Sequence, residues 1–361
     1  MNKERKVLII PLDWGLGHAT RCIPIIHYMI SKGWSVTLAG EGKVAQLLAE
    51  EFPTLEVLPL RGYRISYPAK GWLFVPKIIL QIPKIIGAIA YENRWLKKNI
   101  ALHTWDLVIS DNRYGLFTND AKTIIITHQL SVITGIGNFA DTVARKIIYR
   151  FINRYNACWV PDTEDQNNIA DRLSHPKDLP EHVQYIGPLS RLSKKNISEE
   201  NFILILLSGP EPQRTLLENI LIEQASKIDE QFLCVRGLPS SHQKMEDSKN
   251  IRFEYHLPAE ELSTLLARAK MVICRTGYST VMDLLKLQKK AIMIPTPGQT
   301  EQEFLGKRLG ALHWYLIQDQ QHIDLAEGIP QCLQNTPSIP QLDFEEYSRA
   351  IDAFSIQYFG A

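Results

Sequence analysis

A glycine-rich stretch at positions 13–21, Asp-Trp-Gly-Leu-Gly-His-Ala-Thr-Arg, contains residue types that can do chemistry. Gly15 and Gly17 allow the backbone to approach a ligand, and the N-terminus of a following helix offers N–H groups to an anion. His18 has the side chain of a general base, although a helix-capping or structural histidine is the alternative. The stretch is not a G-x-G-x-x-G dinucleotide motif, because Arg21 and Cys22 follow where a third glycine is needed.

A second candidate lies at 274–283, Cys-Arg-Thr-Gly-Tyr-Ser-Thr-Val-Met-Asp. An apolar run ends there, a small polar turn follows, and a helix begins near Tyr278, which together form an anion cradle suited to a diphosphate. Asp283 lies further along that helix, where a carboxylate can accept hydrogen bonds from a ribose; the alternative is an Asp that stabilises the helix dipole. The residues of this turn that are expected to bind the ligand are Arg275, Thr276, Gly277, Tyr278 and Ser279.

A third candidate is the loop at 295–303, Pro-Thr-Pro-Gly-Gln-Thr-Glu-Gln-Glu. The side chains of Gln299, Gln302 and Glu303 suit a hydroxyl-rich ligand such as a sugar. The alternative is a Pro-Gly turn followed by a capped helix in which Thr300 and Glu303 form a capping box, and both interpretations can hold together.

The loop at 208–214, Ser-Gly-Pro-Glu-Pro-Gln-Arg, is a fourth candidate. Ser208, Gly209 and Arg214 can face a phosphate at the start of a helix. Its two prolines remove N–H donors, so this cradle is poorer than a glycine-rich one and the loop is expected to line the site.

These motifs follow short, β-branched runs that alternate with helix-period sequence, the pattern of buried parallel strands and their crossover helices. The first series of predicted strands is 7–10, 35–39, 55–59, 106–110, 123–127 and 157–160, and the second is 202–207, 231–235, 251–255, 271–274 and 290–295. The sequence therefore predicts an α/β fold with two doubly wound, Rossmann-like domains. Their ligand is expected in one interdomain cleft, beside the carboxyl ends of both sheets.

A length of 361 residues agrees with two domains at about 150 residues each. A Gly-Pro turn and a polar stretch separate the two series of strands. We predict an N-terminal domain at 1–188, a linker at 189–201 and a C-terminal domain at 202–340. Residues 341–361 are predicted to form a helix that packs back across the domains.

The composition excludes several classes of protein. Hydrophobic residues make up 45% of the chain, charged residues 22%, and the net charge is +1, which provides no basic excess for binding nucleic acid. The five cysteines form no C-x-x-C pair, so neither a zinc site nor a disulfide framework is encoded. The start of the chain has no signal-peptide core. We expect a cytoplasmic protein without a metal or a cofactor.

One segment departs from this balanced charge. Residues 57–105 contain eight basic residues and one acidic residue, and an apolar run at 72–86 lies among them. Two lysines and two prolines argue against a membrane span, and the pattern fits an interfacial helix drawn to anionic lipid; a buried crossover helix with a solvated stripe is the alternative. The residues predicted to contact a membrane are Trp72, Phe74, Lys77, Ile78 and Lys84. They place the protein peripherally on the inner face of the cell membrane.

Together these residues resemble glycosyltransferase family 28, of GT-B architecture, which includes the peptidoglycan N-acetylglucosaminyltransferases that form lipid II. The resemblance is strongest over 274–302, where Arg-Thr-Gly-Tyr-Ser-Thr-Val-Met-Asp and Pro-x6-Gln are similar to the donor-binding motif. It implies that Asp283 stands in place of a ribose-binding Glu and that Gln302 contacts the donor sugar. Glu303 stands where the family has a second Gln.

The resemblance extends to the acceptor side, where 15–18 is similar to the family's glycine-rich loop and its histidine, implicated in acceptor activation. This chain has Asp13 and Trp14 where the lipid II enzyme has glycines. The 72–90 segment lies where that enzyme has its membrane-association patch. Residues 128–129 keep part of a further motif. The resemblance thus implies that the 1–188 domain binds the acceptor and faces the membrane and that the 202–340 domain binds the nucleotide sugar. The acceptor-side residues are expected to be Gly15, Gly17, Arg21, Asp111, His128 and Gln129.

The resulting hypothesis is an inverting, metal-independent transfer from a nucleotide diphosphate sugar, expected to be a UDP-sugar, to a hydroxyl of a lipid-linked or membrane-associated acceptor. The chain has no D-x-D triplet, so helix N-termini and Arg must stabilise the leaving diphosphate. The alternatives are a nucleotide-sugar 2-epimerase of the same fold, which needs no acceptor, and a non-catalytic nucleotide-sugar-binding subunit.

Overall fold

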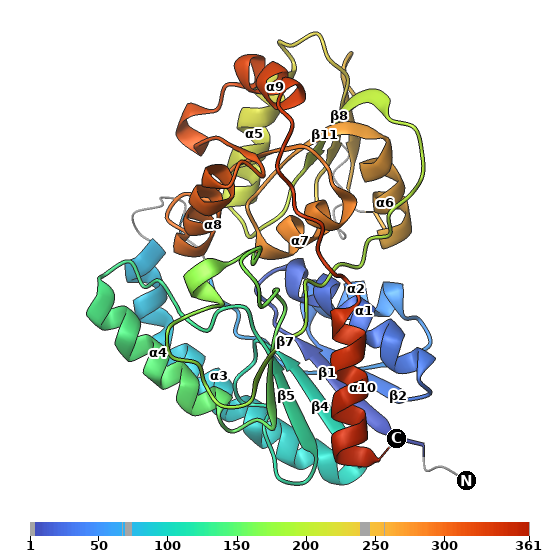
Figure 1. Ribbon diagram of the computed structural model, residues 1–361, viewed down its shortest axis with the longest axis vertical. Coiled ribbons are helices and arrows are strands. Elements are labelled where there is room, and N and C mark those ends of the chain that lie inside the picture. The colour runs from blue at the N-terminus through green and yellow to red at the C-terminus, as the bar shows by residue number, and fades with distance from the viewer. Residues whose placement is uncertain (1–3, 67, 69–73, 239–245, 256, 361) are drawn as a thin grey trace. The chain divides into compact units, whose positions relative to one another are not determined.

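The computed structural model describes residues 4–66, 68, 74–238, 246–255 and 257–360. Helices alternate with parallel strands, which confirms the predicted α/β class (Figure 1). The chain divides into two compact units. Unit 1 comprises Met1–Ile65, Ile78–Leu189 and Leu342–Ala361, and unit 2 comprises Ser66–Lys77 and Ser190–Gln341.

Unit 1 is built on a seven-stranded parallel sheet in the order β3-β2-β1-β4-β5-β6-β7. Strand β1 lies inside this sheet, paired with β2 on one side and β4 on the other, and its Val-Leu-Ile-Ile run is fully buried, as expected for a strand with helices on both faces. The strands are β1 (Lys6–Pro11), β2 (Ser35–Gly40), β3 (Glu56–Pro59), β4 (Leu107–Asp111), β5 (Lys122–Ile126), β6 (Ala157–Val160) and β7 (Val183–Tyr185).

The helices of unit 1 bury their apolar faces on this sheet. Leu96 and Ile100 of α3, for example, pack with Leu8 and Val108 of the strands. The helices are α1 (Leu16–Ser31), α2 (Gly42–Glu51), α3 (Phe74–His103), α4 (Asn138–Ile152) and α10 (Glu346–Phe359), with a 3-10 turn η2 (Asp171–Leu173). The first residues of α3 belong to unit 2.

Unit 2 has a six-stranded parallel sheet in the order β10-β9-β8-β11-β12-β13. Its core joins strand residues such as Ile205 and Ile273 to Leu217 and Leu221 of helix α5. The strands are β8 (Glu200–Leu206), β9 (Phe232–Val235), β10 (Ile251–Glu254), β11 (Ala269–Cys274), β12 (Ala291–Met293) and β13 (Leu316–Ile317). The helices are α5 (Gln213–Ala225), α6 (Ala259–Arg268), α7 (Tyr278–Leu287), α8 (Thr300–Ala311) and α9 (Leu325–Gln334), with a 3-10 turn η3 (Gln320–His322).

The division into units differs from the predicted boundaries in three places. Strand β8 begins at Glu200, inside the predicted linker, and unit 2 begins at Ser190. Residues 66–77 were predicted in the first domain but cluster with unit 2, where the Gln213 amide donates to the carbonyl of Pro68 at 3.4 Å. Helix α10 was predicted to pack across the domains, and it clusters with unit 1.

Helix α3 is buried along part of its length and exposed along the rest. Its C-terminal half is a buried crossover helix, as Leu96 shows, whereas Leu80 and Ile86 of its N-terminal half are exposed. Proline 83 lies inside this helix. Among the described residues, no helix is both long enough and apolar enough to cross a membrane.

Candidate functional site

Several residues that were predicted to face an acceptor lie in unit 1 at the point where the order of the strands reverses. Strands β1 and β4 are neighbours, but the chain leaves them toward opposite edges of the sheet, and such a switch point leaves a crevice at the carboxyl ends of the strands. Strand β1 leads into α1, whose first turn contains His18, and Asp111 is the last residue of β4. Gly15 precedes α1 with φ 104°, a conformation that favours glycine.

Four side chains form a hydrogen-bonded cluster at this switch point. Nδ1 of His18 lies 3.3 Å from Oδ1 of Asp111. The Arg21 guanidinium donates to both carboxylate oxygens of Asp111, with Nε at 2.7 Å from Oδ2, and it also reaches Nδ1 of His18 at 2.8 Å and Nδ1 of His128 at 3.1 Å. Arg21, Asp111 and His128 are buried, and His18 is partly buried. The structure thus brings together four predicted site residues that are up to 110 positions apart in the sequence.

The electrostatics of this cluster keep Asp111 ionised and His18 neutral. Burial alone would raise the pKa of Asp111, but the charge of Arg21 and the contacts with His18 outweigh it and hold that pKa far below its usual range. Burial lowers the pKa of His18, the Arg21 charge lowers it further, and Asp111 only partly opposes them. Only a neutral imidazole can take up a proton, so this protonation state is compatible with a general base.

Two other residues that were predicted on the acceptor side, Gly17 and Gln129, make backbone hydrogen bonds near the cluster. The backbone N–H of Gln129 donates to Oγ1 of Thr127 at 3.1 Å, in the turn that follows β5. The carbonyl of Gly17 accepts from Oγ1 of Thr20 at 3.0 Å in the first turn of α1.

The sequence did not reveal the function of Asp13. Its carboxylate accepts hydrogen bonds from the backbone N–H groups of Tyr63 at 2.9 Å and Arg64 at 3.1 Å, which ties the glycine-rich loop to the segment after β3. A lone Asp before two glycines carries no sequence signal for a partner 50 residues away. Asp13 therefore fixes the loop that leads to His18.

The predicted donor residues of unit 2 also lie around a switch point, between β8 and β11. Gly277, which has no side chain to cap the helix, is the N-cap of α7. Thr276 is buried, and its hydroxyl donates to the carbonyl of Gln302 at 2.9 Å. Ser208 and Gly209, the latter at φ 103°, follow the neighbouring strand β8.

The two arginines of this region make contacts within the protein. Arg275 is buried and donates to the carbonyls of Gln213 at 2.9 Å and Pro295 at 3.1 Å. Arg214 is buried between Glu211 at 2.6 Å and Glu218 at 3.1 Å, which balance its charge. These contacts hold together the loops around the switch point, and they direct both guanidinium groups toward protein atoms.

The loop after β12 is held by two of its predicted ligand-binding residues. The side-chain oxygen of Gln302 accepts from the backbone N–H of Thr296 at 2.9 Å, and Glu303 accepts from the N–H of Gly298 at 2.6 Å. The predicted capping box is wrong in its first member, because Gln299 and not Thr300 is the N-cap of α8. The Oε1 atom of Gln299 is buried and has no hydrogen-bond partner in the structure.

Asp283 lies in α7 and accepts a hydrogen bond from Oγ of Ser190 at 2.5 Å. Burial raises the pKa of Asp283 to about 6, although this hydrogen bond and the charges of Arg191 and Lys286 oppose the shift. Tyr278 is buried and Ser279 is partly buried in the first turn of the same helix. The carboxylate is thus positioned before any ligand binds.

The predicted membrane residues are only partly described. Trp72 lies outside the described residues, and the side chain of Phe74 is not described. Lys77 and Ile78 are partly buried, whereas Lys84 is exposed and donates to the carbonyl of Arg64. Eight of the exposed apolar side chains are neighbours of these residues on α3 or lie on and before α4: Ile79, Leu80, Ile82, Ile86, Ile136, Phe139, Val143 and Ile147. Others lie elsewhere, such as Leu102 near the C-terminal end of α3 and Leu179.

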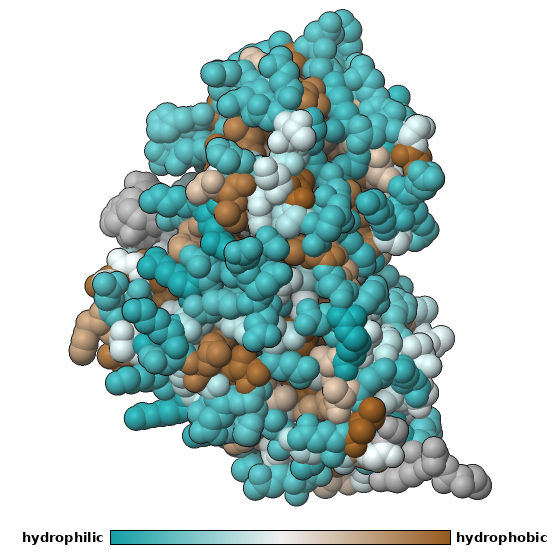
Figure 2. All heavy atoms as spheres, viewed as in Figure 1, coloured by the Kyte–Doolittle hydropathy of each residue, from teal (hydrophilic) through white to brown (hydrophobic). Residues whose placement is uncertain are grey.

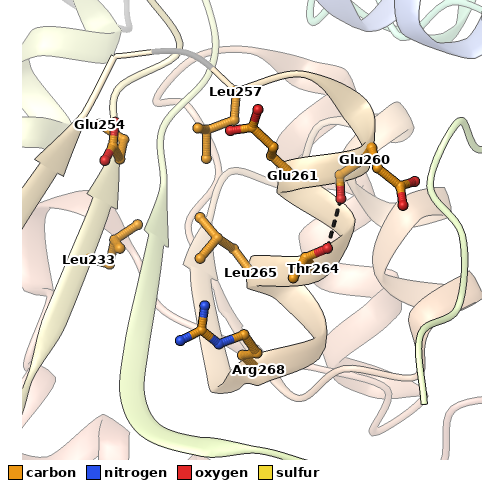
Figure 3. A pocket seen from close by; sticks show the side chains of 8 residues that line it. All are labelled: Leu233, Glu254, Leu257, Glu260, Glu261, Thr264, Leu265 and Arg268. Carbon is orange, nitrogen blue, oxygen red and sulfur yellow. Dashed lines mark hydrogen bonds between the residues drawn. The ribbon is translucent and has the colours of Figure 1, made fainter. Parts of the chain in front are cut away.

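Two cavities of unit 2 contain none of the predicted site residues. One, of about 320 Å³, lies between Leu233 and Glu254 on β9 and β10 and the Thr264, Leu265 and Arg268 side chains of α6 (Figure 3). The other, of about 570 Å³, is lined by residues between Lys290 and Ser338. Among the described residues, no group of three or more His, Cys, Asp or Glu side chains is arranged to hold a metal ion.

Comparisons with known proteins agree with the fold and the motifs. Residues 205–341 match the glycosyltransferase family 28 C-terminal domain. An enzyme of Clostridium perfringens (strain SM101 / Type A), named UDP-N-acetylglucosamine--N-acetylmuramyl-(pentapeptide) pyrophosphoryl-undecaprenol N-acetylglucosamine transferase, is 32% identical over 285 residues, 77% of this chain and 75% of that enzyme. The enzyme of the same name from Histophilus somni (strain 129Pt) is 22% identical over 366 residues, 97% of this chain and 94% of its own.

A solved structure, described as the glycotransferase of kitacinnamycin, superposes with a TM-score of 0.69 at 14% identity, covering 99% of this chain and 100% of that one. The fold is thus that of the GT-B glycosyltransferases, as predicted. The chain belongs to glycosyltransferase family 28, and the protein is a glycosyltransferase.

Proposed function

We propose that this enzyme transfers a sugar, with inversion, from a UDP-sugar to a hydroxyl of a lipid-linked or membrane-associated acceptor. The observation that carries the chemistry is the contact between His18 and the buried, ionised Asp111 at the switch point of unit 1. The substrate class is supported by the names of the relatives, which specify a UDP-linked donor and a pyrophosphoryl-undecaprenol acceptor.

In the proposed reaction, the oxygen of the acceptor hydroxyl attacks the anomeric carbon of the donor sugar. Its proton passes to the imidazole of His18, and the bond between the anomeric carbon and the diphosphate oxygen breaks, with the electron pair leaving on UDP. Attack from the face opposite the leaving group inverts the anomeric configuration. The N-terminus of α7, with Gly277 as its N-cap, stabilises the developing negative charge without a metal.

Unit 2 is proposed to hold the donor. Asp283 would exchange its hydrogen bond from Ser190 for bonds from the ribose hydroxyls, and the N-terminus of its own helix α7 would receive the diphosphate. The side-chain oxygen of Gln302 already accepts from Thr296, so its amide nitrogen is the atom left to donate to a sugar hydroxyl. Arg275 and Arg214 would support this site through the loops that they hold.

Unit 1 is proposed to contact the membrane through α3 and α4. Leu80 is 81% exposed and Phe139 is 84% exposed, and Phe139, Val143 and Ile147 recur every four residues along one face of α4. Hydrophobic surface is visible at the edge of the molecule where Figure 1 places α4 (Figure 2). With the basic excess of residues 57–105, this apolar surface suits an interface with anionic lipid.

The proposal is tested first by calorimetric titration of the protein with UDP, and with GDP, CMP and NAD for comparison. We expect micromolar binding of UDP alone, weakened at least tenfold in Asp283→Ala, equal to about 1.4 kcal/mol. Equal or absent binding of all four nucleotides would overturn the donor assignment. Product formed from a UDP-sugar without any acceptor would instead show an epimerase.

A further inference from the structure

Arg21 contacts every other member of the His18 cluster, although the proposed reaction uses only a histidine base and its carboxylate partner. It is 2% exposed, and its guanidinium group bonds Asp111 through Nε at 2.7 Å, His128 Nδ1 at 3.1 Å and His18 Nδ1 at 2.8 Å. Its charge already has a partner in Asp111. The contact with His18 is therefore an additional feature whose chemical consequence can be worked out.

A guanidinium nitrogen carries only N–H donors and has no acceptor. Because Arg21 donates to Nδ1 of His18, that ring nitrogen must provide a lone pair, and the neutral ring then carries its single proton on Nε2. In this tautomer Nε2 presents an N–H group. It can donate a hydrogen bond to a ligand oxygen, but it has no lone pair with which to take a proton.

Asp111 favours the opposite tautomer. Its Oδ1 lies 3.3 Å from the same Nδ1 and can only accept, so this contact requires the proton on Nδ1 and leaves the lone pair on Nε2. The Arg21 contact is the shorter of the two by 0.5 Å. The ring therefore lies between a donor and an acceptor that require different tautomers, and the donor, Arg21, is the nearer of the two.

We propose that Arg21 is a positioning residue that holds His18, in the enzyme without ligands, in the tautomer with its proton on Nε2. The inference rests on the proposed function of His18 as the base. To accept the proton of the attacking hydroxyl at Nε2, the ring must first release its own proton from Nε2 to solvent and take one from solvent at Nδ1. The new Nδ1–H group then donates a hydrogen bond to Asp111. Arg21 thus opposes the reactive form of the base and Asp111 stabilises it.

The charged and titratable groups that face His18 come from three elements: Arg21 on its own helix α1, Asp111 at the end of β4 and His128 after β5. Arg21 and His128 lower the pKa of His18, and Asp111 raises it. Removing the guanidinium group would leave Asp111 as the nearest charge to His18. The ring would then bind Asp111 through Nδ1–H and hold a proton more strongly.

Nitrogen-15 NMR of the full chain with labelled histidine tests the tautomer directly, because protonated and unprotonated ring nitrogens resonate far apart. His18→Gln identifies the signals of His18. We expect an unprotonated Nδ1 and a protonated Nε2 in the wild type, and the reverse pattern in Arg21→Met. A protonated Nδ1 in the wild-type protein would overturn the proposal. This measurement needs no substrate, so it stands apart from the UDP titration that tests the proposed function.

The pH dependence of kcat/KM provides a second readout. Activity of a base rises with pH through its pKa, so the midpoint of the acid limb should move up by at least one pH unit in Arg21→Met. Arg21→Lys keeps the cation without the planar fork, and it should move the midpoint less. Loss of thermal stability in both variants with unchanged midpoints would show a purely structural arginine and would overturn the proposal. If Arg21→Met does not fold, Arg21→Lys and the wild-type spectrum still decide.

Discussion

Removal of the His18 side chain should slow the reaction without affecting donor binding. We expect His18→Ala to lower kcat by about 10²- to 10⁴-fold, the usual contribution of a general base. Binding of UDP should stay unchanged, because the proposed donor residues all lie in unit 2. Steady-state transfer assays and calorimetry measure the two effects separately.

The matched control for this substitution is His27→Ala. His27 lies on the same helix α1 but is exposed, and its ring packs on Phe52. Its removal should leave turnover close to the wild-type value. If His18→Ala also turns over near-normally while still binding UDP, another group takes the proton.

The buried carboxylate of Asp283 is expected to lower the stability of the folded protein at neutral pH while it serves ligand binding. Its pKa of about 6 lies above the ordinary value of 3.8, so the folded state binds the proton more tightly than the unfolded state, and the contribution of this group to stability falls as the pH rises from about 4 to 6. Asp283→Asn should therefore be more stable than the wild type at pH 7.5, by about 2 kcal/mol. The gain should disappear below pH 4 in denaturant titrations, and UDP binding should be weakened at every pH.

Asp343→Asn provides the opposite case. Arg349 beside Asp343 lowers the pKa of that carboxylate, so its ionised form stabilises the folded state at neutral pH and this contribution is lost as the pH falls. The substitution should lower stability slightly at pH 7.5. Equal pH dependence in the two variants would contradict the assigned pKa shifts.

Among the elements, α3 and α4 are predicted to bind lipid. Leu80→Glu with Ile86→Glu places two negative charges on the exposed face of α3, where they are repelled by anionic headgroups. We expect co-sedimentation with vesicles that contain anionic phospholipid to fall at least tenfold. The melting temperature should change little, because both side chains are already in water.

Ile356→Glu is the control for this substitution, since Ile356 is 61% exposed on α10 of the same unit but outside the proposed membrane surface. It should leave vesicle binding unchanged. Equal losses in both proteins would mean that added negative charge, and not the surface of α3, explains the effect.

Elements differ in how well the sequence predicts them. Strands β1 and β6 were predicted almost residue for residue, because a short, fully buried apolar run between turn residues has few other structures open to it. Strands β7 and β13 were missed, since three and two residues are too short to show any period. Leu80 is exposed, whereas Ile78 is partly buried. This difference depends on the rotation of α3 about its axis, which cannot be predicted from the periodicity of the sequence alone.

At the scale of the whole molecule, the two compact units should unfold in separate calorimetric transitions. Phe354 of α10 packs edge-on against Trp159 with ring centroids 5.9 Å apart, so Phe354→Ala should destabilise unit 1 by about 3 to 5 kcal/mol. Phe232→Ala in the core of unit 2 should instead lower the other transition. UDP identifies the unit 2 transition by raising its temperature. A single transition lowered by both substitutions would contradict this assignment.

The candidate site shows where sequence reasoning reaches its limit. The residues of the His18 cluster could be named from motifs and from resemblance, because each follows a predicted strand. Their mutual contacts could not be predicted, since the bonds of Arg21 to Asp111 and to two imidazoles depend on side-chain geometry at the ends of strands β1, β4 and β5. The inward direction of Arg275 was hidden for the same reason.

The return of α10 to unit 1 has a consequence for how the chain folds during synthesis. Unit 2 is formed by residues 66–77 and the continuous segment 190–341, so it can complete its sheet and helices as soon as that segment leaves the ribosome. In unit 1, by contrast, Trp159 packs against Phe354, which is synthesised almost 200 residues later. Domains generally fold in the order in which they are made. In this protein, unit 1 is synthesised first but completes its folding last. A chaperone that shields the nascent chain would therefore bind unit 1.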